Sequence, residues 1–197
     1  QCIAVVSGKG GTGKTSLVES MLYMTGSIDR LGKVTEGNTV CDSDPEEAKR
    51  QISISLAVAP VKFKGCKINV LDTPGYFDFS GEEMEGLRVA DAGIIVGSAK
   101  GGLSVGTEKA WKYLQERNMP RAIYIAKTDE ENGDFNGAWQ TLREKFGRSV
   151  CPVMMPLWDE EKHIETLLDI VYRRAYQLEG KRRKEVPIPA DKQEWVF

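Results

Sequence analysis

The residues best suited to chemistry form a glycine-rich segment, GKGGTGKT, at positions 8–15. This segment fits the pattern G-x-x-x-x-G-K-[ST] and lies between an apolar run and a helical pattern, as a phosphate-binding loop requires. Its glycines let backbone N–H groups surround phosphates, and the N-terminus of the following helix adds a favourable dipole. We expect Lys14 to reach the β- and γ-phosphates of a nucleotide and the Thr15 hydroxyl to bind Mg²⁺. The predicted nucleotide-binding residues of this loop are Gly8, Lys9, Gly10, Gly11, Thr12, Gly13, Lys14, Thr15 and Ser16.

A second candidate site is the turn Asp72-Thr73-Pro74-Gly75, which ends an apolar strand pattern. Its spacing places a carboxylate and a glycine N–H at the same edge of a sheet. We expect Asp72 to hold the metal through water and the Gly75 N–H to contact the γ-phosphate. Ser53 lies at the end of a polar segment, just before the predicted hairpin strand. We expect its hydroxyl to bind Mg²⁺ when a γ-phosphate orders that segment. A capped turn and a serine at a strand start are the structural alternatives.

The tetrapeptide Ala126-Lys127-Thr128-Asp129 follows another apolar strand pattern and bears on which base is bound. The Asp129 carboxylate can accept hydrogen bonds from guanine N1–H and the guanine 2-amino group together. Adenine offers no matching donors, so this contact discriminates against ATP. The pattern favours GTP or GDP, with Lys127 and Asp129 on the base side, although a Lys-x-Asp turn by itself is also common in solvated loops.

The elements that must position these residues alternate between strand and helix. Strand patterns occur at residues 2–6, 68–71, 92–97, 121–126 and 150–155, and helix patterns at 14–24, 82–90, 107–117 and 135–146. Such alternation builds an α/β sheet with helices on both faces. Residues 52–58 alternate apolar with small or polar side chains, and the short turn before residue 68 predicts an antiparallel hairpin. The predicted fold is a three-layer α/β P-loop NTPase, with a mostly parallel sheet and one antiparallel hairpin strand.

Two segments differ from this alternation. Residues 26–50 are polar and charged, and we expect a mobile loop there because little apolar surface offsets the cost of ordering. Towards the end of the chain, the pattern predicts a helix at residues 164–175 and a basic stretch at residues 181–184. We therefore divide the chain into a nucleotide-binding core, residues 1–156, and the start of an inserted subdomain, residues 157–197.

The composition limits the partners that we expect. Of 197 residues, 41% are hydrophobic and 28% are charged, and the net charge of −2 indicates no general attraction to nucleic acid, so we expect no sequence-specific DNA binding. The four cysteines form no CxxC pair and His163 is the sole histidine, which argues against a structural zinc site. No apolar run reaches the ~18 residues that a membrane span needs, and no leader pattern is present. These features predict a cytoplasmic protein without a membrane partner.

The motifs together resemble the GTP-binding domain of the translation elongation factor G family, whose relatives include tetracycline-resistance ribosomal protection proteins. The resemblance runs through GNTVCDSDPEEAKRQISIS, INVLDTPGYFDFSGEEMEGLRVADAGIIVGSAKGG, AKTD and LLDIVYRRAYQLEGKRRKEVPIPAD. It implies GTP hydrolysis on the ribosome, with GTP or GDP and Mg²⁺ as ligands. It also implies a switch I segment at residues 29–53, a switch II segment at residues 72–85 and an insertion that begins near Leu157. The parent protein would then be a longer, multidomain factor.

Four departures from the family pattern affect this expectation. Ser53 replaces the usual Thr but keeps the hydroxyl. Tyr76 follows DTPG where the family has a catalytic His, and a phenol with a pKa of about 10 cannot act as an imidazole does near pH 7, so we expect slow hydrolysis. Ala126 replaces the Asn that steadies the phosphate loop and the base, and the family's later Ser-Ala guanine-contact loop does not occur before Phe197. The predicted catalytic residues are Lys14, Gly75 and Tyr76.

Two other interpretations stay open. The string from Ser7 to Thr15 also fits KGGxGK[ST], the deviant Walker A pattern of partitioning-type ATPases, in which Lys9 would reach a second nucleotide across a dimer. The predicted hairpin before Asp72, the KTD turn and the match to the elongation-factor insertion count against that class. The second interpretation is a nucleotide-binding regulatory domain that no longer hydrolyses, which Tyr76 supports. Single-turnover GTP hydrolysis separates it from an active GTPase.

Overall fold

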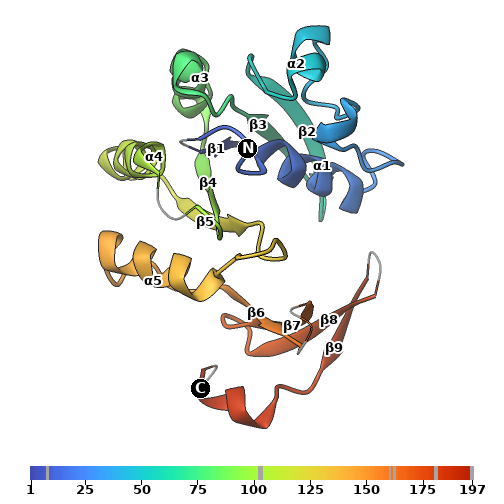
Figure 1. Cartoon of the computed structure of the whole chain (residues 1–197), viewed down its shortest axis with the longest axis vertical. Helices are drawn as coiled ribbons and strands as arrows, with labels where there is room; N and C mark the ends of the chain where they lie inside the picture. Colours follow the sequence, from blue (N-terminus) through green and yellow to red (C-terminus); the bar gives the residue numbers. More distant parts are fainter. Residues whose placement is uncertain (8, 102–103, 160, 162, 180–181, 196–197) are drawn as a thin grey trace. The chain divides into compact units, whose positions relative to one another are not determined.

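The computed structural model describes the chain except for residues 8, 102–103, 160, 162, 180–181 and 196–197 (Figure 1). The chain forms two compact units. The first contains residues 1–128 and 132–138, and the second contains residues 129–131 and 139–197. Each unit has a sheet of its own, so the two are described separately.

The first unit is built on a five-stranded sheet. Its strands are β1 (Cys2–Val6), β2 (Ala57–Phe63), β3 (Cys66–Asp72), β4 (Ala92–Ser98) and β5 (Arg121–Ala126). They lie in the order β2-β3-β1-β4-β5, with β2 antiparallel to β3 and the other neighbours parallel. The predicted fold class, a mostly parallel sheet with one antiparallel hairpin strand, is confirmed.

Helices connect the parallel strands of this unit. They are α1 (Lys14–Met24), α2 (Pro45–Arg50), α3 (Ser80–Val89) and α4 (Val105–Glu116), with 3₁₀ turns η1 (Val34–Glu36) and η2 (Phe77–Phe79). Helix α5 (Phe135–Phe146) follows β5, and its residues from Trp139 onward belong to the second unit. The connection from β1 to β3 runs in the opposite direction across the sheet to those from β3 to β4 and from β4 to β5. Since such crossovers are right-handed, α1 lies on one face and α3 and α4 on the other, as Figure 1 shows.

The hairpin between β2 and β3 explains the antiparallel strand. Lys64 and Gly65 form its two-residue turn with φ values of 47° and 78°, and Phe63 pairs with Cys66. Positive φ at both turn positions matches the twist of the two strands. The hairpin prediction is confirmed, but the expectation that its first strand begins at Ile52 is wrong, because β2 begins at Ala57. The backbone just before Ala57 bonds to carboxylates instead of to a neighbouring strand.

The core of the first unit lies between α1 and the sheet. It consists of buried aliphatic side chains together with one cysteine, namely Val5, Val18, Leu22, Cys41, Ala59, Val61, Val70 and Val96. Strand β1 contributes from the centre of the sheet, and α1 contributes from the adjacent layer. This packing holds the end of β1 and the start of α1 in place, and the phosphate-binding loop connects these two points.

The second unit is a four-stranded antiparallel sheet of β6 (Met154–Trp158), β7 (Ile164–Asp169), β8 (Arg174–Glu179) and β9 (Arg182–Val186), in that order. A 3₁₀ turn, η3 (Ala190–Trp195), follows. The predicted helix at residues 164–175 is wrong. Thr166 and Leu168, two residues apart, are buried on one face of β7, and the Asp169 carboxylate accepts a hydrogen bond from the Tyr172 N–H in the turn to β8.

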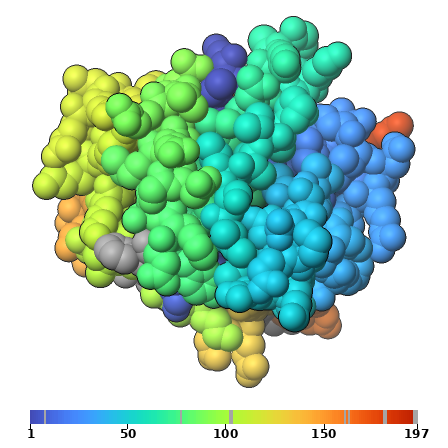
Figure 2. Space-filling view, turned by 90° about the horizontal axis from the view of Figure 1, so that it is seen from above, coloured from blue at the N-terminus to red at the C-terminus, as the bar shows by residue number. Residues whose placement is uncertain are grey.

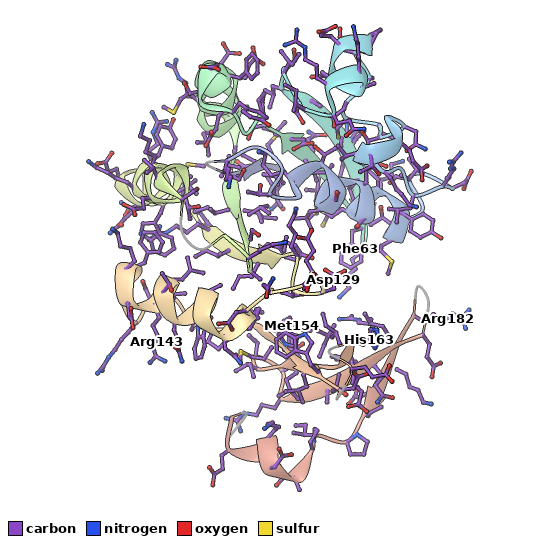
Figure 3. All side chains as sticks on the ribbon, viewed as in Figure 1. Phe63, Asp129, Arg143, Met154, His163 and Arg182 are labelled. Atoms are coloured by element: carbon purple, nitrogen blue, oxygen red, sulfur yellow. The ribbon has the colours of Figure 1, made fainter. Side chains whose placement is uncertain are left out.

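Two further expectations concern residues of this sheet. The strand expected at residues 150–155 begins only at Met154 and pairs with β7, so it belongs to the antiparallel sheet and not to the parallel one. Strand β6 also includes Leu157, the residue at which we placed the start of an inserted subdomain. Figure 3 shows the side chains of this unit, where His163 lies near two acidic groups, Asp159 and Glu161. Within the described ranges, no helix is long and apolar enough to cross a membrane.

Candidate nucleotide-binding site

The glycine-rich loop joins the end of β1 to the start of α1. Gly11 and Gly13 have φ values of 71° and 97°, which favour glycine. Helix α1 begins at Lys14, and its N-cap, Gly13, offers no side chain to the free N–H groups of the first turn. Such a helix start can receive a phosphate. Gly8 was also predicted to contact phosphate, but it lies outside the described residues.

Ser7 organises the loop from within, and the sequence analysis assigned it no role. Its fully buried hydroxyl donates to the Lys9 carbonyl at 2.9 Å. The same oxygen accepts from the Thr12 hydroxyl and from Lys14 Nζ, both at 2.8 Å. These contacts hold the start and the end of the loop against Ser7, the residue that follows β1. The only signal in the sequence was its position immediately before the first glycine.

Lys14 carries a positive charge into a site with little solvent. Burial lowers its pKa, while the carboxylates of Asp72, Glu83 and Asp42 oppose that shift. The DTPG turn lies directly against it, since a Cβ atom on Gly75 would overlap Lys14 Nζ. The structure therefore brings two of the predicted catalytic residues, Lys14 and Gly75, together.

The DTPG turn is itself anchored to β1. The buried Thr73 hydroxyl donates to the Val5 carbonyl at 2.8 Å, and the Thr73 N–H donates to the same oxygen at 3.3 Å. Because β1 and β3 are parallel neighbours, the turn emerges at the same sheet edge as the glycine-rich loop. The relative placement of the two motifs follows from this pairing.

The three predicted metal ligands supply oxygen atoms in one place. The hydroxyls of Thr15 and Ser53 lie 3.2 Å apart, and Ser53 donates to Asp42 Oδ1 at 2.6 Å. Asp72 is buried, and neither of its carboxylate oxygens has a hydrogen-bond partner among the described residues. Burial raises the pKa of Asp72 to about 7, against the opposing effects of the Thr15 hydroxyl and Lys14. A buried, unpartnered carboxylate beside two hydroxyls is the donor set that fits a hard cation such as Mg²⁺.

Asp42 is a part of this site that the sequence analysis did not single out. It is buried beside Ser53, and burial raises its pKa while the bond from the Ser53 hydroxyl opposes the shift. Its position in the quoted stretch GNTVCDSDPEEAKRQISIS was the available signal. Its carboxylate fixes the direction of the Ser53 hydroxyl.

The polar segment expected to be a mobile loop, residues 26–50, has local structure. Glu19 of α1 is fully buried and accepts from the N–H groups of Gly32 at 3.1 Å and Val40 at 2.5 Å. Helix α2 begins with a capping box between Asp44 and Glu47. Hydrogen bonds to buried carboxylates thus supply contacts that hydrophobicity alone did not predict. In the space-filling view of Figure 2, this blue to cyan segment covers one flank of the first unit.

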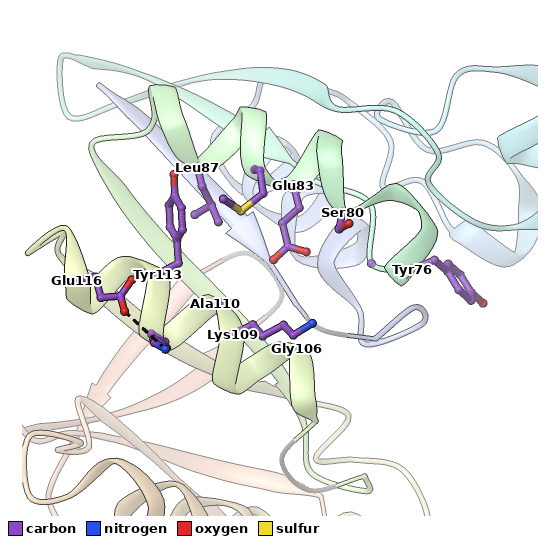
Figure 4. Close-up of a pocket in the computed structure, with 12 residues that line it drawn as sticks. Tyr76, Ser80, Glu83, Leu87, Gly106, Lys109, Ala110, Tyr113 and Glu116 are labelled. Carbon is purple, nitrogen blue, oxygen red and sulfur yellow. Dashed lines mark ion pairs between the residues drawn. The ribbon is translucent and has the colours of Figure 1, made fainter.

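Tyr76 lies between two cavities. Its ring packs on the glycine-rich loop, since a Cβ atom on Gly10 would lie 2.5 Å from Tyr76 Cζ. Gly75 and Tyr76 line both the cavity of about 60 Å³ at the loop and a larger cavity of about 370 Å³ between α3 and α4. Figure 4 shows the larger cavity, with Glu83 pointing from α3 towards α4 and Lys109. Burial raises the pKa of Glu83 to about 7, and the nearby Lys14 and Lys109 oppose this shift.

The AKTD turn spans the boundary between the two units. Ala126 ends β5 next to the glycine-rich loop, since a Cβ atom on Gly13 would lie 3.5 Å from Ala126 Cβ. Lys127 follows with a φ of 61°. Asp129 belongs to the second unit. Ala126 therefore fills the space beside the loop without any polar side-chain atom, and the guanine contact of Asp129 stays a prediction.

A strand, a glycine-rich loop and a helix with buried Lys and Thr at its start define a P-loop nucleotide-binding domain. Residues 2–188 match the family described as the elongation factor Tu GTP binding domain, and the chain belongs to that family. It is accordingly a guanine-nucleotide-binding domain of the GTPase class. The family match and the antiparallel β2–β3 pair both disfavour the deviant Walker A ATPase interpretation of Lys9.

Relatives of this chain carry the name elongation factor G. An elongation factor G-like protein of Mycobacterium tuberculosis is 37% identical over 188 residues, covering 95% of this chain and 26% of that protein. Elongation factor G of Thermotoga petrophila is 38% identical over 163 residues, covering 83% of this chain and 23% of its own length. A crystal structure from Thermus thermophilus superposes with a TM-score of 0.91 at 36% identity, covering all of this chain and 29% of that one. The predicted resemblance is confirmed, and the chain spans about a quarter of these relatives.

Proposed function

We propose that this domain binds GTP and GDP with Mg²⁺ and hydrolyses GTP slowly, as part of a longer elongation factor G-like protein that acts on the ribosome. The observation that carries the metal-dependent part is the buried, unpartnered Asp72 carboxylate beside the hydroxyls of Thr15 and Ser53. Isolating such a charge in the protein interior is costly unless a cation or a hydrogen bond compensates it. Bound Mg²⁺ would neutralise charge on the phosphates and on Asp72.

The residues of the chain divide the work of phosphate binding. Backbone N–H groups of the loop and of the first turn of α1 would surround the phosphates. They belong to Gly8, Lys9, Gly10, Gly11, Thr12, Gly13, Lys14, Thr15 and Ser16. Lys14 supplies the positive charge, held in position by Ser7. Gly75 contacts the γ-phosphate through its N–H. Gly75 and Tyr76 line the cavity at the loop, so a nucleotide bound there would contact the start of switch II.

Slow hydrolysis is proposed from Tyr76. Phosphoryl transfer depends on positioning the attacking water, and a phenol has one O–H to donate and no imidazole nitrogen that could accept the proton of that water. The ring also packs against Gly10, which holds it over the phosphate loop. The domain should therefore bind nucleotide well and turn it over slowly. Tyr76 is equally compatible with a regulatory domain that does not hydrolyse GTP. A single-turnover assay distinguishes the two, because GTP would then remain uncleaved.

The wider role is proposed from the relatives. Guanine specificity rests on Lys127 and Asp129, which follow β5. Residues 157–197 are proposed to begin a subdomain inserted in the parent factor, beyond the core at residues 1–156. Coupling to the ribosome would require that parent, and ribosome binding places the protein in the cytoplasm. We propose neither a membrane nor a specific DNA sequence as a partner.

Titration of the domain with fluorescent GDP and with a non-hydrolysable GTP analogue, each with and without Mg²⁺, tests this proposal. We expect ATP to bind far more weakly than either guanine nucleotide. Mg²⁺ should tighten binding of the analogue more than binding of GDP, because Ser53 is expected to contact the metal only when a γ-phosphate is present. Equal affinity for ATP and GTP, or no effect of Mg²⁺ on the analogue, would contradict it.

A further inference from the structure

The backbone just after Ser53 is held in an uncommon way. Three consecutive N–H groups donate to two carboxylates that come from different helices. Those of Ile54 and Ser55 donate to Glu47 Oε1 of α2 at 2.8 and 3.0 Å. That of Leu56 donates to Glu82 Oε2 of α3 at 2.8 Å. A strand partner would normally satisfy such donors, and here α2 and α3 replace it.

Further contacts hold the Glu47 carboxylate on one side and Leu56 on the other. Glu47 is buried, and its second oxygen accepts from the Asp44 N–H at 3.3 Å within the capping box of α2. On the α3 side, the Leu56 side chain packs on Gly86, since a Cβ atom there would lie 3.1 Å from Leu56 Cδ1. Leu56 is thus held by α3 through both its backbone and its side chain. Charge-assisted bonds of this kind are the stronger class of hydrogen bond.

We propose that Glu47 and Glu82 are positioning residues that clasp residues 54–56 and thereby place the Ser53 hydroxyl beside Thr15. The proposal rests on the proposed function, in which Thr15 and Ser53 bind Mg²⁺ next to the γ-phosphate. Ser53 is one residue before the clasped segment and is also held by Asp42. Releasing the clasp would leave the Asp42 bond as the remaining constraint on that hydroxyl.

The clasp also joins the two switches. Helix α3 starts at Ser80, four positions after Tyr76 and directly after η2. A displacement of the DTPG turn is transmitted along this short path to Glu82 and from there to the Leu56 N–H. Glu82 therefore makes the position of Ser53 depend on the position of switch II. The neighbouring Glu83 plays no part in this contact, because it points into the cavity between α3 and α4 (Figure 4).

The test compares Glu82→Ala with Glu82→Gln, and with Glu85→Ala as the matched control. Glu85 lies on the same helix and is exposed. In the whole chain with Mg²⁺, we expect Glu82→Ala to weaken the non-hydrolysable GTP analogue by about 10-fold, the size of one charge-assisted hydrogen bond, and GDP by less than about 2-fold. Glu82→Gln keeps an acceptor oxygen and should restore most of the analogue affinity. The control should match the wild type for both nucleotides.

Hydrogen exchange provides a readout that does not depend on nucleotide. The amide of Leu56 should exchange faster in Glu82→Ala, and those of Ile54 and Ser55 should exchange faster in Glu47→Ala, while Glu46→Ala leaves all three unchanged. Equal losses for GDP and the analogue, or no analogue effect at all, would overturn the clasp while Mg²⁺-dependent binding in the wild type still supports the proposed function. A wild type whose analogue binding ignores Mg²⁺, and is unaffected by Ser53→Ala, would instead overturn the proposed function and the clasp with it.

Discussion

Replacing Gly10 with alanine tests whether the phosphate loop holds Tyr76 in place. A Cβ atom at Gly10 would lie 2.5 Å from Cζ and 2.8 Å from Cδ2 of the Tyr76 ring. Both distances are far inside van der Waals contact, so the ring must leave the loop. The φ of Gly10 is not among the positive values of the described glycines, so alanine adds no left-handed strain. The substitution therefore acts through the tyrosine.

The size of the effect follows from how much of the ring is covered. Tyr76 is 45% exposed, so a little more than half of its surface is buried. An aromatic side chain covers roughly 150–250 Å² when fully buried, so displacing this ring exposes on the order of 100 Å². At about 25 cal/mol per Å², the free energy of unfolding should fall by at most about 2.5 kcal/mol, and by less than that where ring contacts re-form elsewhere.

A double-mutant cycle measured by urea unfolding of the nucleotide-free chain checks this reasoning. Gly10→Ala and Tyr76→Ala should each lower stability by a similar amount, and the double variant should be no less stable than Tyr76→Ala. Gly81→Ala is the control, because a Cβ atom there meets nothing within 4 Å. Additive losses from Gly10→Ala and Tyr76→Ala would show that Gly10 is sensitive for a reason other than the tyrosine, and the packing argument would fail.

Four other results are expected. Asp129→Asn should cost about 2–3 kcal/mol of GTP binding, about a hundredfold, and shift preference towards xanthosine nucleotides in a competition assay; unchanged GTP affinity would remove Asp129 from the base site. Limited proteolysis should cut residues 29–50 less when a γ-phosphate analogue and Mg²⁺ are present than with GDP, and identical patterns in a chain that binds nucleotide would argue against Ser53 as a ligand. Tyr76→His in the full-length parent should raise ribosome-dependent GTP hydrolysis by roughly 10- to 1000-fold without changing GDP affinity. Finally, burial raises the pKa of Glu83 from 4.5 to about 7, so the folded state binds more protons than the unfolded state between these values, and stability should fall as pH rises through this window. Glu83→Gln should flatten that dependence by up to about 3 kcal/mol in unfolding measurements across pH 4–8, and an unchanged slope would mean that Glu83 is not the titrating group.

Local signals predicted most of the first unit. Residues close together in the chain determine the glycine-rich loop, the Lys64–Gly65 turn and the limits of α1, and the structure agrees with each prediction. The alternation of strand and helix patterns predicted a mostly parallel sheet with one antiparallel hairpin strand, while the order of the strands came from the structure. The donor set of the site was predictable for the same reason, because parallel β1 and β3 deliver two short motifs to one edge.

The second unit shows where local reasoning failed. Residues 164–175 contain apolar side chains at spacings that suit a helix, but the same residues also alternate, as in Thr166 and Leu168. Spacing alone did not distinguish the two, since short apolar runs fit either period. The decisive feature was the turn between β7 and β8, in which Asp169 bonds the Tyr172 N–H and Arg173 takes a φ of 54°. No strong turn signal such as Asn-Gly marks it in the sequence.

The contacts that hold the polar segment at residues 26–56 are a different case, because they depend on partners far apart in the chain. Glu19 lies on α1 yet bonds to Val40, and Glu82 lies on α3 yet bonds to Leu56. In the sequence each of these acids is indistinguishable from an exposed helical glutamate. A buried carboxylate stabilises the fold only when backbone N–H groups donate hydrogen bonds to it. If those N–H groups move away, the same carboxylate is left buried without a partner and destabilises that arrangement. This makes the segment sensitive to small displacements of α1 and α3. Such sensitivity suits the proposed role of this segment in responding to a γ-phosphate, and it arises from polar contacts that hydrophobic patterning does not detect.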